Sequence, residues 1–230
     1  MSEGLFITVE GPDGAGKSTL IQGLKERLEA RTAREVILTR EPGGSPLAEV
    51  IREVLLDNRY GEMDGRTEAL LMAASRRQHI VDTILPALEA GKIVLSDRYV
   101  DSSLAYQGAG RELGIEAVRT INAFAIEEVV PTMTILLDVD AQTGLARIHD
   151  KQSGRAVDRL EQEDISFHNR VRSGYQTLRE AEPDRFIYVD ATCEPATVLE
   201  ESWKLLNKYL DKLVDELYLC LLYTSLMARG

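Results

Sequence analysis

Apolar and polar positions alternate along this chain in two distinct patterns. Short runs rich in Ile, Val and Leu are typical of strands buried on both faces of a parallel sheet. Longer segments with apolar residues at every third or fourth position are typical of amphipathic helices. The predicted strands are residues 5–9, 34–39, 93–96, 132–138 and 186–190, with helical patterns between them and after the last one.

Strands that alternate with helices predict an α/β fold, with one five-stranded parallel sheet and helices on both of its faces. No repeat and no Pro- or Ser-rich linker divides the 230 residues, so residues 1–213 are predicted to form a single domain. Residues 214–230 are treated as a C-terminal tail. Its last part, LCLLYTSLMARG, continues no clear helical stripe, and three interpretations stay open: helix extension, disordered tail or foreign sequence.

The longest helical pattern, residues 66–90, contains two features that need an explanation. Pro86 has no backbone N–H and would break this helix unless a kink is tolerated there. Arg76 lies close to an apolar Leu-Leu-Met segment, so that its guanidinium can be buried. A buried arginine requires an anionic partner, whereas His79 in the same helix is expected to be structural.

The net charge of −11 is spread along the chain rather than gathered in a tail. This balance argues against nucleic acid or an anionic membrane surface as the main partner, so any phosphate site must concentrate positive charge locally. Cys193 and Cys220 show no metal-binding spacing. Together with the lack of a basic signal segment and of a long apolar run, this predicts a soluble protein of the cytoplasm.

The segment from Leu5 to Thr19 carries the clearest chemical signal. A strand pattern leads into Gly11–Ser18, which fits G-x-x-x-x-G-K-[ST] at every fixed position, and a helical pattern follows. Glycines let several backbone N–H groups converge on phosphate oxygens, and the helix N-terminus adds partial positive charge. Lys17 can reach the outer phosphates, and the Ser18 hydroxyl suits Mg²⁺. The predicted nucleotide-binding positions are Gly11, Pro12, Asp13, Gly14, Ala15, Gly16, Lys17, Ser18 and Thr19.

Two further strands end in candidate site residues. The second is followed by the loop Arg40–Pro46, which lies over the crevice where α/β sheets bind ligands; Arg40 and Glu41 there can be solvated loop charges or site residues. The third ends at Asp97, whose carboxylate suits Mg²⁺ or its water, although a strand-end salt bridge is the alternative. The segment 100–111 mixes hydroxyls, an amide and an aromatic ring, as expected of a lining for a polar ring system.

A short lid is predicted at about residues 150–159. The segment DKQSGRAVD is charged, contains glycine and has no apolar periodicity. Lys151, Arg155 and Arg159 give it local positive charge in an acidic protein. After it, VDRLEQ is predicted to continue into a helix that ends near Ala181.

Several motifs recur together and in order, and the sequence resembles the bacterial thymidylate kinases. The motifs are FITVEGPDGAGKST, TREPGGSPLAEVIREVLL, the Arg-x-Gln-His helix, VLSDRYVDSSLAYQGAGR, DVDAQTGLAR and DRLEQE, over about residues 4–212. The resemblance implies a P-loop nucleotide kinase fold, with transfer of the γ-phosphoryl group of ATP to dTMP. It also implies Mg²⁺ as cofactor and a homodimer.

The resemblance also implies roles for individual residues. Lys17 and the loop amides would hold the ATP phosphates, while Ser18 and Asp97 would serve the metal. Asp13 would accept a hydrogen bond from the 3′-hydroxyl of dTMP. Arg98, Arg76 and Arg52 would converge on the acceptor phosphate, with Ser103, Tyr106 and Gln107 around thymine and deoxyribose. The implied substrate-binding set is Asp13, Arg40, Arg52, Met72, Arg76, Arg98, Ser103, Tyr106 and Gln107, and the catalytic set is Lys17, Asp97, Arg98, Arg155 and Arg159.

Two features distinguish this chain within the family it resembles. Its phosphate loop contains no arginine, so it resembles the subgroup whose catalytic arginine lies in the lid. Arg155 is favoured over Arg159, because Asp158 and Arg159 can form a structural pair at a helix start. Met72 stands where many family members place an aromatic ring on thymine; its soft sulfur can still contact a ring face.

Two rival hypotheses are considered, one on the same fold and one from another functional class. The first is another nucleoside monophosphate kinase or a deoxynucleoside kinase, against which the REPGG and YQG blocks argue. The second is a P-loop ATPase that acts as a regulatory switch. Such proteins need a segment that senses the γ-phosphate, such as D-x-x-G after a strand, and Asp97-Arg98-Tyr99 is not one.

Overall fold

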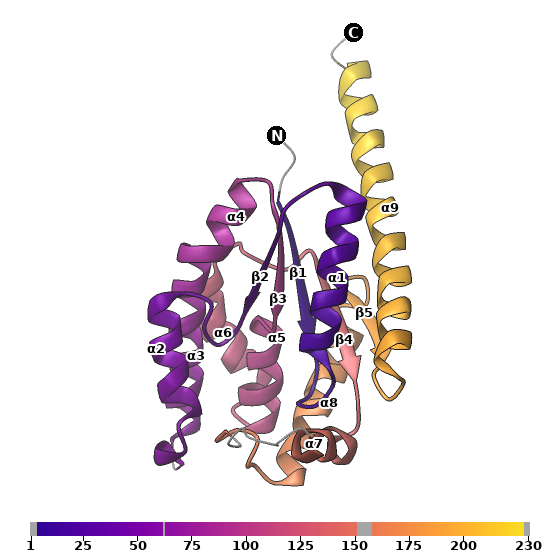
Figure 1. The fold of residues 1–230 in the computed structure, drawn as a ribbon. Coiled ribbons are helices and arrows are strands. Elements are labelled where there is room, and N and C mark those ends of the chain that lie inside the picture. Colours follow the sequence, from indigo (N-terminus) through magenta and orange to yellow (C-terminus); the bar gives the residue numbers. More distant parts are fainter. Residues whose placement is uncertain (1–3, 62, 151–157, 228–230) are drawn as a thin grey trace.

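The structure, a computed structural model, describes residues 4–61, 63–150 and 158–227, with side chains described as far as residue 212. Five parallel strands form one sheet in the order β2-β3-β1-β4-β5 (Figure 1). The predicted α/β fold with a five-stranded parallel sheet is thus confirmed. The strands are β1 (Leu5–Glu10), β2 (Val36–Arg40), β3 (Ile93–Asp97), β4 (Met133–Asp138) and β5 (Phe186–Asp190).

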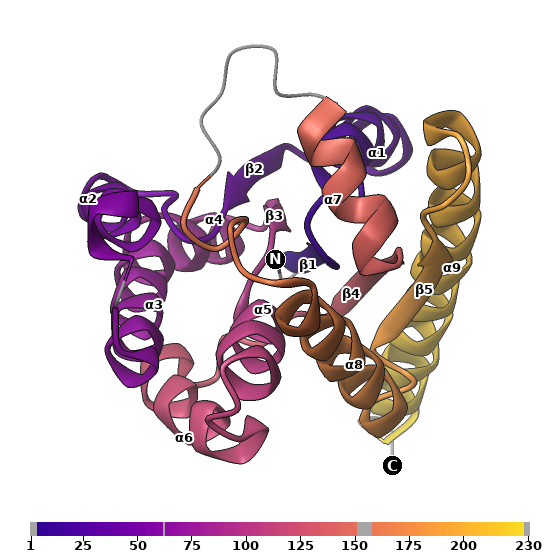
Figure 2. The same ribbon diagram turned by 90° about the horizontal axis from the view of Figure 1, so that it is seen from below.

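Successive side chains of a strand point to opposite faces of the sheet, so the core is divided into two layers, each covered by helices. On one face, Ile7, Leu95 and Ile135 pack with α1 (Lys17–Thr32) and α9 (Pro195–Met227). Figure 2 shows these two helices side by side on that face. The other face is covered by α3 (Gly65–His79), α4 (Leu85–Glu89), α5 (Val100–Ser103), α6 (Ile115–Ile126) and α8 (Ile165–Ala181), with α2 (Pro46–Leu56) packed outside α3.

The helix that contains Pro86 continues through a widened turn. Residues Ile80–Ile84 are π-helical and link α3 to α4, and the Leu85 N–H bonds to the Ile80 carbonyl, five residues back. A π-helical turn changes the hydrogen-bonding pattern just where proline would leave a carbonyl without its donor. The predicted break at Pro86 therefore takes the form of a widened turn within one long helical segment.

The prediction for the segment after the lid was wrong in its boundary. The chain turns over residues 159–163, and α8 begins only at Ile165, where Asp164 caps it by accepting a 2.8 Å hydrogen bond from the Phe167 N–H. The side chain of Asp158 also accepts from nearby backbone N–H groups, which stabilises a turn in place of a helix. Residues 151–157 of the predicted lid, with Lys151 and Arg155, lie outside the described residues.

Three further elements complete the described part of the chain. These are a 3₁₀ turn (Asn58–Tyr60), a second π-helical segment (Leu104–Gly110) and α7 (Ala141–Asp150). The backbone of α9 stays helical to Met227, well past the predicted end near residue 213, and extends beyond the sheet (Figure 1). No helix within the described ranges is long and apolar enough to cross a membrane.

Candidate active site

A cleft of about 360 Å³ opens at the carboxyl ends of β1, β2 and β3. This is where parallel α/β sheets place their ligands. Residues from the phosphate loop, the β2–α2 loop, α3, the end of β3 and the 100–110 helical segment meet there. Of the predicted site residues, the lining includes Asp13, Gly14, Gly16, Lys17, Ser18, Thr19, Arg40, Arg52, Met72, Arg76, Asp97, Arg98, Ser103, Tyr106 and Gln107.

Backbone conformation shapes the phosphate loop. Gly14 has a φ of +75°, and a Cβ on it would lie 2.1 Å from the Gly144 carbonyl oxygen of α7. Gly11 has a φ of +137°, and a Cβ there would lie 2.2 Å from the Leu137 carbonyl oxygen of β4. Only glycine fits both positions, which explains the motif spacing physically.

Lys17 begins α1 inside this loop. Its buried ammonium group donates hydrogen bonds to the carbonyls of Gly11 at 3.0 Å and Pro12 at 2.9 Å. Burial first, and the nearby Arg98 charge second, lower the pKa of Lys17 to about 8, although Asp97 and Asp13 oppose the shift. A bound phosphate would stabilise the charged form of Lys17 and so offset the cost of burying this cation.

Ser18 and Asp97 form a pair of oxygen ligands suited to Mg²⁺. The Ser18 hydroxyl donates to the Asp97 carboxylate at 3.2 Å, and both side chains line the cleft. Among the described residues there is no cluster of three or more His, Cys, Asp or Glu side chains that could hold a metal. Mg²⁺ in nucleotide sites uses one or two protein oxygens together with phosphates and water, so this pair fits such an ion.

Arg98 lines the cleft directly after the end of β3. Its backbone has a φ of +71°, which is uncommon for a residue with a side chain. The guanidinium donates to the Asp13 carboxylate at 2.5 Å, the Gly11 carbonyl at 3.0 Å and the Tyr106 hydroxyl at 2.9 Å. Burial alone would raise the pKa of Asp13, but the charges of Arg98 and Lys17 and the Tyr106 hydroxyl lower it overall. Asp13, Arg98 and Tyr106 thus form one polar wall beside the phosphate loop.

Glu10 supports this wall from behind, and the sequence analysis did not identify it. Its buried carboxylate accepts hydrogen bonds from the Tyr99 N–H at 2.7 Å, the Ser102 hydroxyl at 2.6 Å and the Tyr175 hydroxyl at 2.9 Å. Burial and the neighbouring Asp101 raise the pKa of Glu10 to about 7, against the opposing effect of Arg98 and the two hydroxyls. A glutamate at the end of an otherwise apolar strand was the available sequence signal.

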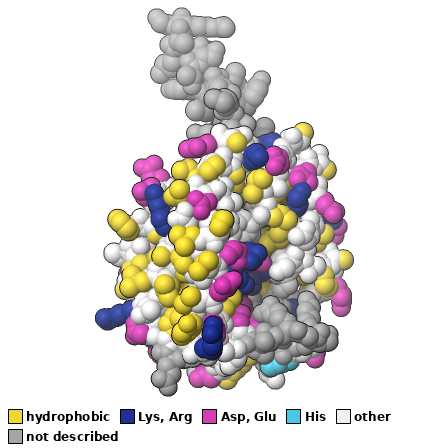
Figure 3. Space-filling model, turned by 60° about the vertical axis from the view of Figure 1, so that its left-hand side comes forward, with side chains coloured by type: hydrophobic (Ala, Val, Ile, Leu, Met, Phe, Trp, Pro, Cys, Tyr) yellow, Lys and Arg dark blue, Asp and Glu magenta, His cyan; other side chains and the backbone are white. Residues whose placement is uncertain are grey.

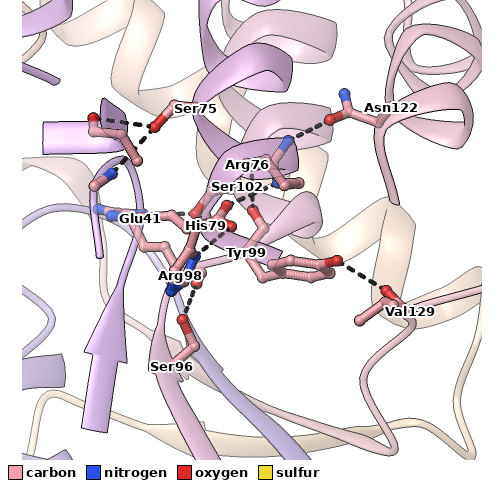
Figure 4. Close-up of polar contacts among 12 residues, drawn as sticks. Glu41, Ser75, Arg76, His79, Ser96, Arg98, Tyr99, Ser102, Asn122 and Val129 are labelled. Carbon is pink, nitrogen blue, oxygen red and sulfur yellow. Dashed lines mark hydrogen bonds and ion pairs between the residues drawn. The ribbon is translucent and has the colours of Figure 1, made fainter. Parts of the chain in front are cut away.

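Arg76 is buried, and it has the anionic partner that the sequence analysis required. Its guanidinium donates to the Glu41 carboxylate at 2.7 Å, the Tyr99 carbonyl at 3.1 Å and the Asn122 side-chain carbonyl (Figure 4). His79 contacts the same carboxylate at 3.0 Å, in agreement with a structural role. Glu41, one of the two loop charges left open above, is therefore part of the buried framework of the cleft.

The other predicted substrate residues come from the end of β2, from α2, from α3 and from the 100–110 segment. Arg52 donates to the Pro42 carbonyl at 2.7 Å, and Arg40 pairs with Glu49 at 2.8 Å on the exposed rim. Met72 is buried and packs in one apolar cluster with Leu55 and Leu160. Arg40, Arg52 and Met72 thus all line the same cleft.

Arg159 lies outside the cleft lining. It is buried, donates to the Leu55 carbonyl at 3.0 Å and pairs with Glu68 at 2.6 Å. Arg159 therefore forms a structural ion pair, but its partner is Glu68 of α3 and not Asp158, as the sequence analysis had suggested.

Arg147 of α7 was not identified by the sequence analysis. It lines the cleft and donates a hydrogen bond to the Ala191 carbonyl at 2.8 Å.

Comparison with known proteins agrees with this geometry. The thymidylate kinase family model matches residues 9–201. Thymidylate kinase from Enterococcus faecalis is 54% identical over 202 residues, which cover 88% of this chain and 95% of that protein. Thymidylate kinase from Limosilactobacillus fermentum is 52% identical over 198 residues, or 86% of this chain and 92% of the relative.

This chain belongs to the thymidylate kinase family. A crystal structure of thymidylate kinase from Ehrlichia chaffeensis has the same fold, with a TM-score of 0.72 and 32% identity over 89% of this chain and 99% of that one. As a member of the thymidylate kinase family, the chain is a nucleotide-binding phosphotransferase with thymidylate kinase activity, in a family that uses ATP.

Proposed function

We propose that the cleft transfers the γ-phosphoryl group of ATP to the 5′-phosphate of dTMP, giving dTDP and ADP. The observation that supports this most strongly is the polar wall of Asp13, Arg98 and Tyr106 beside the phosphate loop. That wall can serve an acceptor nucleotide on one side while the loop holds the donor on the other. Both substrates carry several negative charges, so catalysis requires charge neutralisation and in-line positioning.

At the donor side, Lys17 and the backbone N–H groups of Gly14 and Gly16 would hold the ATP phosphates. Ser18 and Asp97 would hold Mg²⁺, which when bound supplies charge neutralisation on the transferring phosphoryl group. Asp97 can act directly or through a water molecule. An exchange of the Gly11 and Pro12 carbonyls for phosphate oxygens would favour the charged form of Lys17 further, because an anion raises its lowered pKa.

At the acceptor side, Arg98 is the leading candidate for the dTMP phosphate, supported by Arg52 of α2, which lines the same cleft. Their planar guanidinium groups suit bidentate phosphate binding. Arg76 lines the same cleft, but protein acceptors already engage it on three sides, so its contribution would be positive charge and the rigidity of the wall. Asp13 would accept from the 3′-hydroxyl of dTMP.

The nucleoside would lie against Met72, Ser103, Tyr106 and Gln107. The Tyr106 hydroxyl donates to Asp13 at 2.7 Å, which fixes its ring and would crowd a ribose 2′-hydroxyl. The arginine that stabilises transition-state charge would come from the lid, with Arg155 as the candidate and Arg159 as the alternative. The ion pair of Arg159 with Glu68 supports Arg155, because Arg159 would have to give up that buried pair to reach a substrate.

The assembly proposed with this function is a homodimer. Leu47 and Val50 of α2, Leu70 of α3 and Phe124 of α6 are exposed by 52%, 55%, 57% and 90%, respectively. α3 contacts both α2 and α6, and Figure 3 shows hydrophobic side chains gathered on this side of the molecule. A contiguous apolar face of this kind suits a second copy of the same chain. Sedimentation equilibrium should give twice the chain mass of 25.6 kDa, whereas a monomer mass would contradict the homodimer.

The catalytic proposal is tested by the release of ADP from ATP with four acceptors: dTMP, dUMP, AMP and thymidine. We expect rapid turnover with dTMP and none with thymidine, which has no acceptor phosphate. Turnover of AMP without turnover of dTMP would contradict the proposal. ATP and dTMP are cytoplasmic metabolites, so the proposed reaction belongs to the cytoplasm.

A further inference from the structure

Glu68 is a buried carboxylate that neither the predicted site nor the proposed mechanism uses. It lies in the first turn of α3 with no exposed surface. Its Oε1 accepts from Gln107 Nε2 at 2.8 Å, and its Oε2 accepts from Arg111 at 3.0 Å and from Arg159 at 2.6 Å. Three donors from two distant parts of the chain, residues 107–111 and Arg159, therefore meet on one side chain.

The two arginines hold this carboxylate in place. Arg159 also donates to the Leu55 carbonyl, and Arg111 also pairs with Glu163 at 2.6 Å. Each guanidinium is thus anchored at a second point, so Glu68 has little freedom to rotate. Two positive charges beside it also compensate for the burial of a negative charge.

The position of Glu68 determines which way the Gln107 carboxamide faces. A carboxylate flanked by two guanidinium groups is an acceptor only, so Gln107 must present its NH₂ group to Glu68. Gln107 itself lines the cleft and is 1% exposed. With its NH₂ group committed to Glu68, the carbonyl oxygen Oε1 is the end of the amide that remains for a ligand in the cleft.

We propose that Glu68 is a positioning residue for nucleobase selection, acting through Gln107; this rests on the proposed function. A fixed carbonyl oxygen accepts a hydrogen bond from a base edge that carries an N–H donor. Among pyrimidines, thymine has such a donor at N3, whereas N3 of cytosine is an acceptor and would face Oε1 lone pair to lone pair. Buried polar groups left unpaired discriminate strongly between such substrates.

The first experiment compares dTMP with dCMP as acceptors for wild type and for Glu68→Gln. A glutamine at position 68 can present either an oxygen or an NH₂ group, so Gln107 becomes free to turn over. We expect KM for dTMP to rise about tenfold, with kcat and KM for ATP changed by less than about threefold. The preference for dTMP over dCMP in kcat/KM should fall by about tenfold or more.

The matched control is Glu163→Gln. It removes one carboxylate from the same cluster and also touches Arg111, but it does not contact Gln107. This variant should keep the wild-type preference for dTMP over dCMP. Equal changes in both variants, or an unchanged preference in Glu68→Gln, would overturn the proposal.

A second variant, Gln107→Met, keeps the test valid even if Glu68→Gln fails to fold. It removes the carboxamide, and we expect it to lower the preference for dTMP at least as much as Glu68→Gln does. When Glu68→Gln folds, a double-mutant cycle adds to this test: Glu68→Gln should change that preference no further in the Gln107→Met background. A retained preference in Gln107→Met, or a further loss in the double variant, would contradict the route through Gln107. If wild type does not turn over dTMP at all, the proposed function fails; if it does and these variants behave as wild type, only this inference fails.

Discussion

The proposed phosphate end of the cleft is shaped by left-handed backbone angles at Gly11, Gly14 and Arg98, whereas its proposed nucleoside end is built around two buried carboxylates, Glu41 and Glu68. At the first end, the backbone path itself shapes the phosphate loop and places the Arg98 side chain in the lining of the cleft. At the second end, Glu41 holds Arg76 and Glu68 holds Gln107 through side-chain hydrogen bonds. The phosphate end therefore depends on backbone geometry, and the nucleoside end depends on ion pairs and hydrogen bonds that also stabilise the fold.

This difference separates loss of activity from loss of stability. At the phosphate end, Lys17 is proposed to bind the ligand, and its lowered pKa reflects burial that disfavours its charge. A buried carboxylate at the nucleoside end serves the protein first, because its removal leaves an arginine buried without its charge partner. Substitutions at the phosphate end should therefore lower mainly activity, and substitutions at the nucleoside end should lower mainly stability.

The largest effect is expected for Lys17→Met at the phosphate end. It should lower kcat/KM by about 10³-fold, since a charge on the outer phosphates is lost. Its free energy of unfolding should stay within about 1 kcal/mol of wild type, because an apolar group replaces a buried charge. Steady-state kinetics and urea unfolding measure both quantities. Lys25→Met, on the same helix but outside the cleft lining, should change neither; destabilisation by several kcal/mol in Lys17→Met would break the comparison.

Glu41→Gln at the nucleoside end should show the opposite balance. Because Arg76 would lose its buried charge partner, we expect the free energy of unfolding to fall by about 3 kcal/mol. Glu116→Gln removes the exposed partner of Arg119 and should cost less than about 1 kcal/mol. If Glu41→Gln proves as stable as the control in urea unfolding, the nucleoside end is not held by this carboxylate.

Arg155→Ala tests the charge that is proposed to come from the lid. A lid arginine that stabilises only the transition state should lower kcat by two or more orders of magnitude and leave substrate affinities nearly unchanged. Single-turnover rates with ATP and dTMP measure this directly. An unchanged rate would move the role to Arg159 or Lys151.

Glu10 should make stability depend on pH. Its folded-state pKa of about 7 lies above the ordinary value of 4.5, so the folded protein keeps a proton that the unfolded chain releases between these values. Its contribution is complete below about pH 4.5 and is lost as the pH rises through about 7. Relative to Glu10→Gln, the wild type should therefore lose about 2 kcal/mol between pH 5 and pH 7. Glu128→Gln, at an exposed glutamate, should follow the wild-type profile; a wild-type curve parallel to Glu10→Gln would contradict the shift.

The phosphate end was largely predictable from sequence because its determinants are local. The glycine spacing of residues 11–18 and the strand that ends at Asp97 place the loop, the predicted metal ligands and Arg98 without knowledge of distant contacts. The sheet was predictable for the same reason, because each of its strands is a short apolar run in the sequence. Which lid arginine is catalytic stays a prediction.

The supporting carboxylates were not predictable in this way. Glu41 and Arg76 are separated by 35 positions, and Glu68 and Arg159 by 91, so no local sequence pattern predicts either pair. The start of α8 was misplaced because the side chain of Asp158 stabilises a turn, which helical periodicity alone does not reveal. Pairing between distant charged groups is decided by the fold, and for Arg76 the sequence could state only that a partner had to exist.

The central claim is that one cleft holds donor and acceptor nucleotides on the two sides of the wall formed by Asp13, Arg98 and Tyr106. The most direct measurement is calorimetric titration with a bisubstrate analogue that joins adenosine to thymidine through a polyphosphate chain, alone and in the presence of ATP or dTMP. We predict one analogue bound per chain and weakened binding in the presence of either substrate. An analogue that competes with only one substrate, or that binds twice per chain, would show that the two nucleotides do not share this cleft.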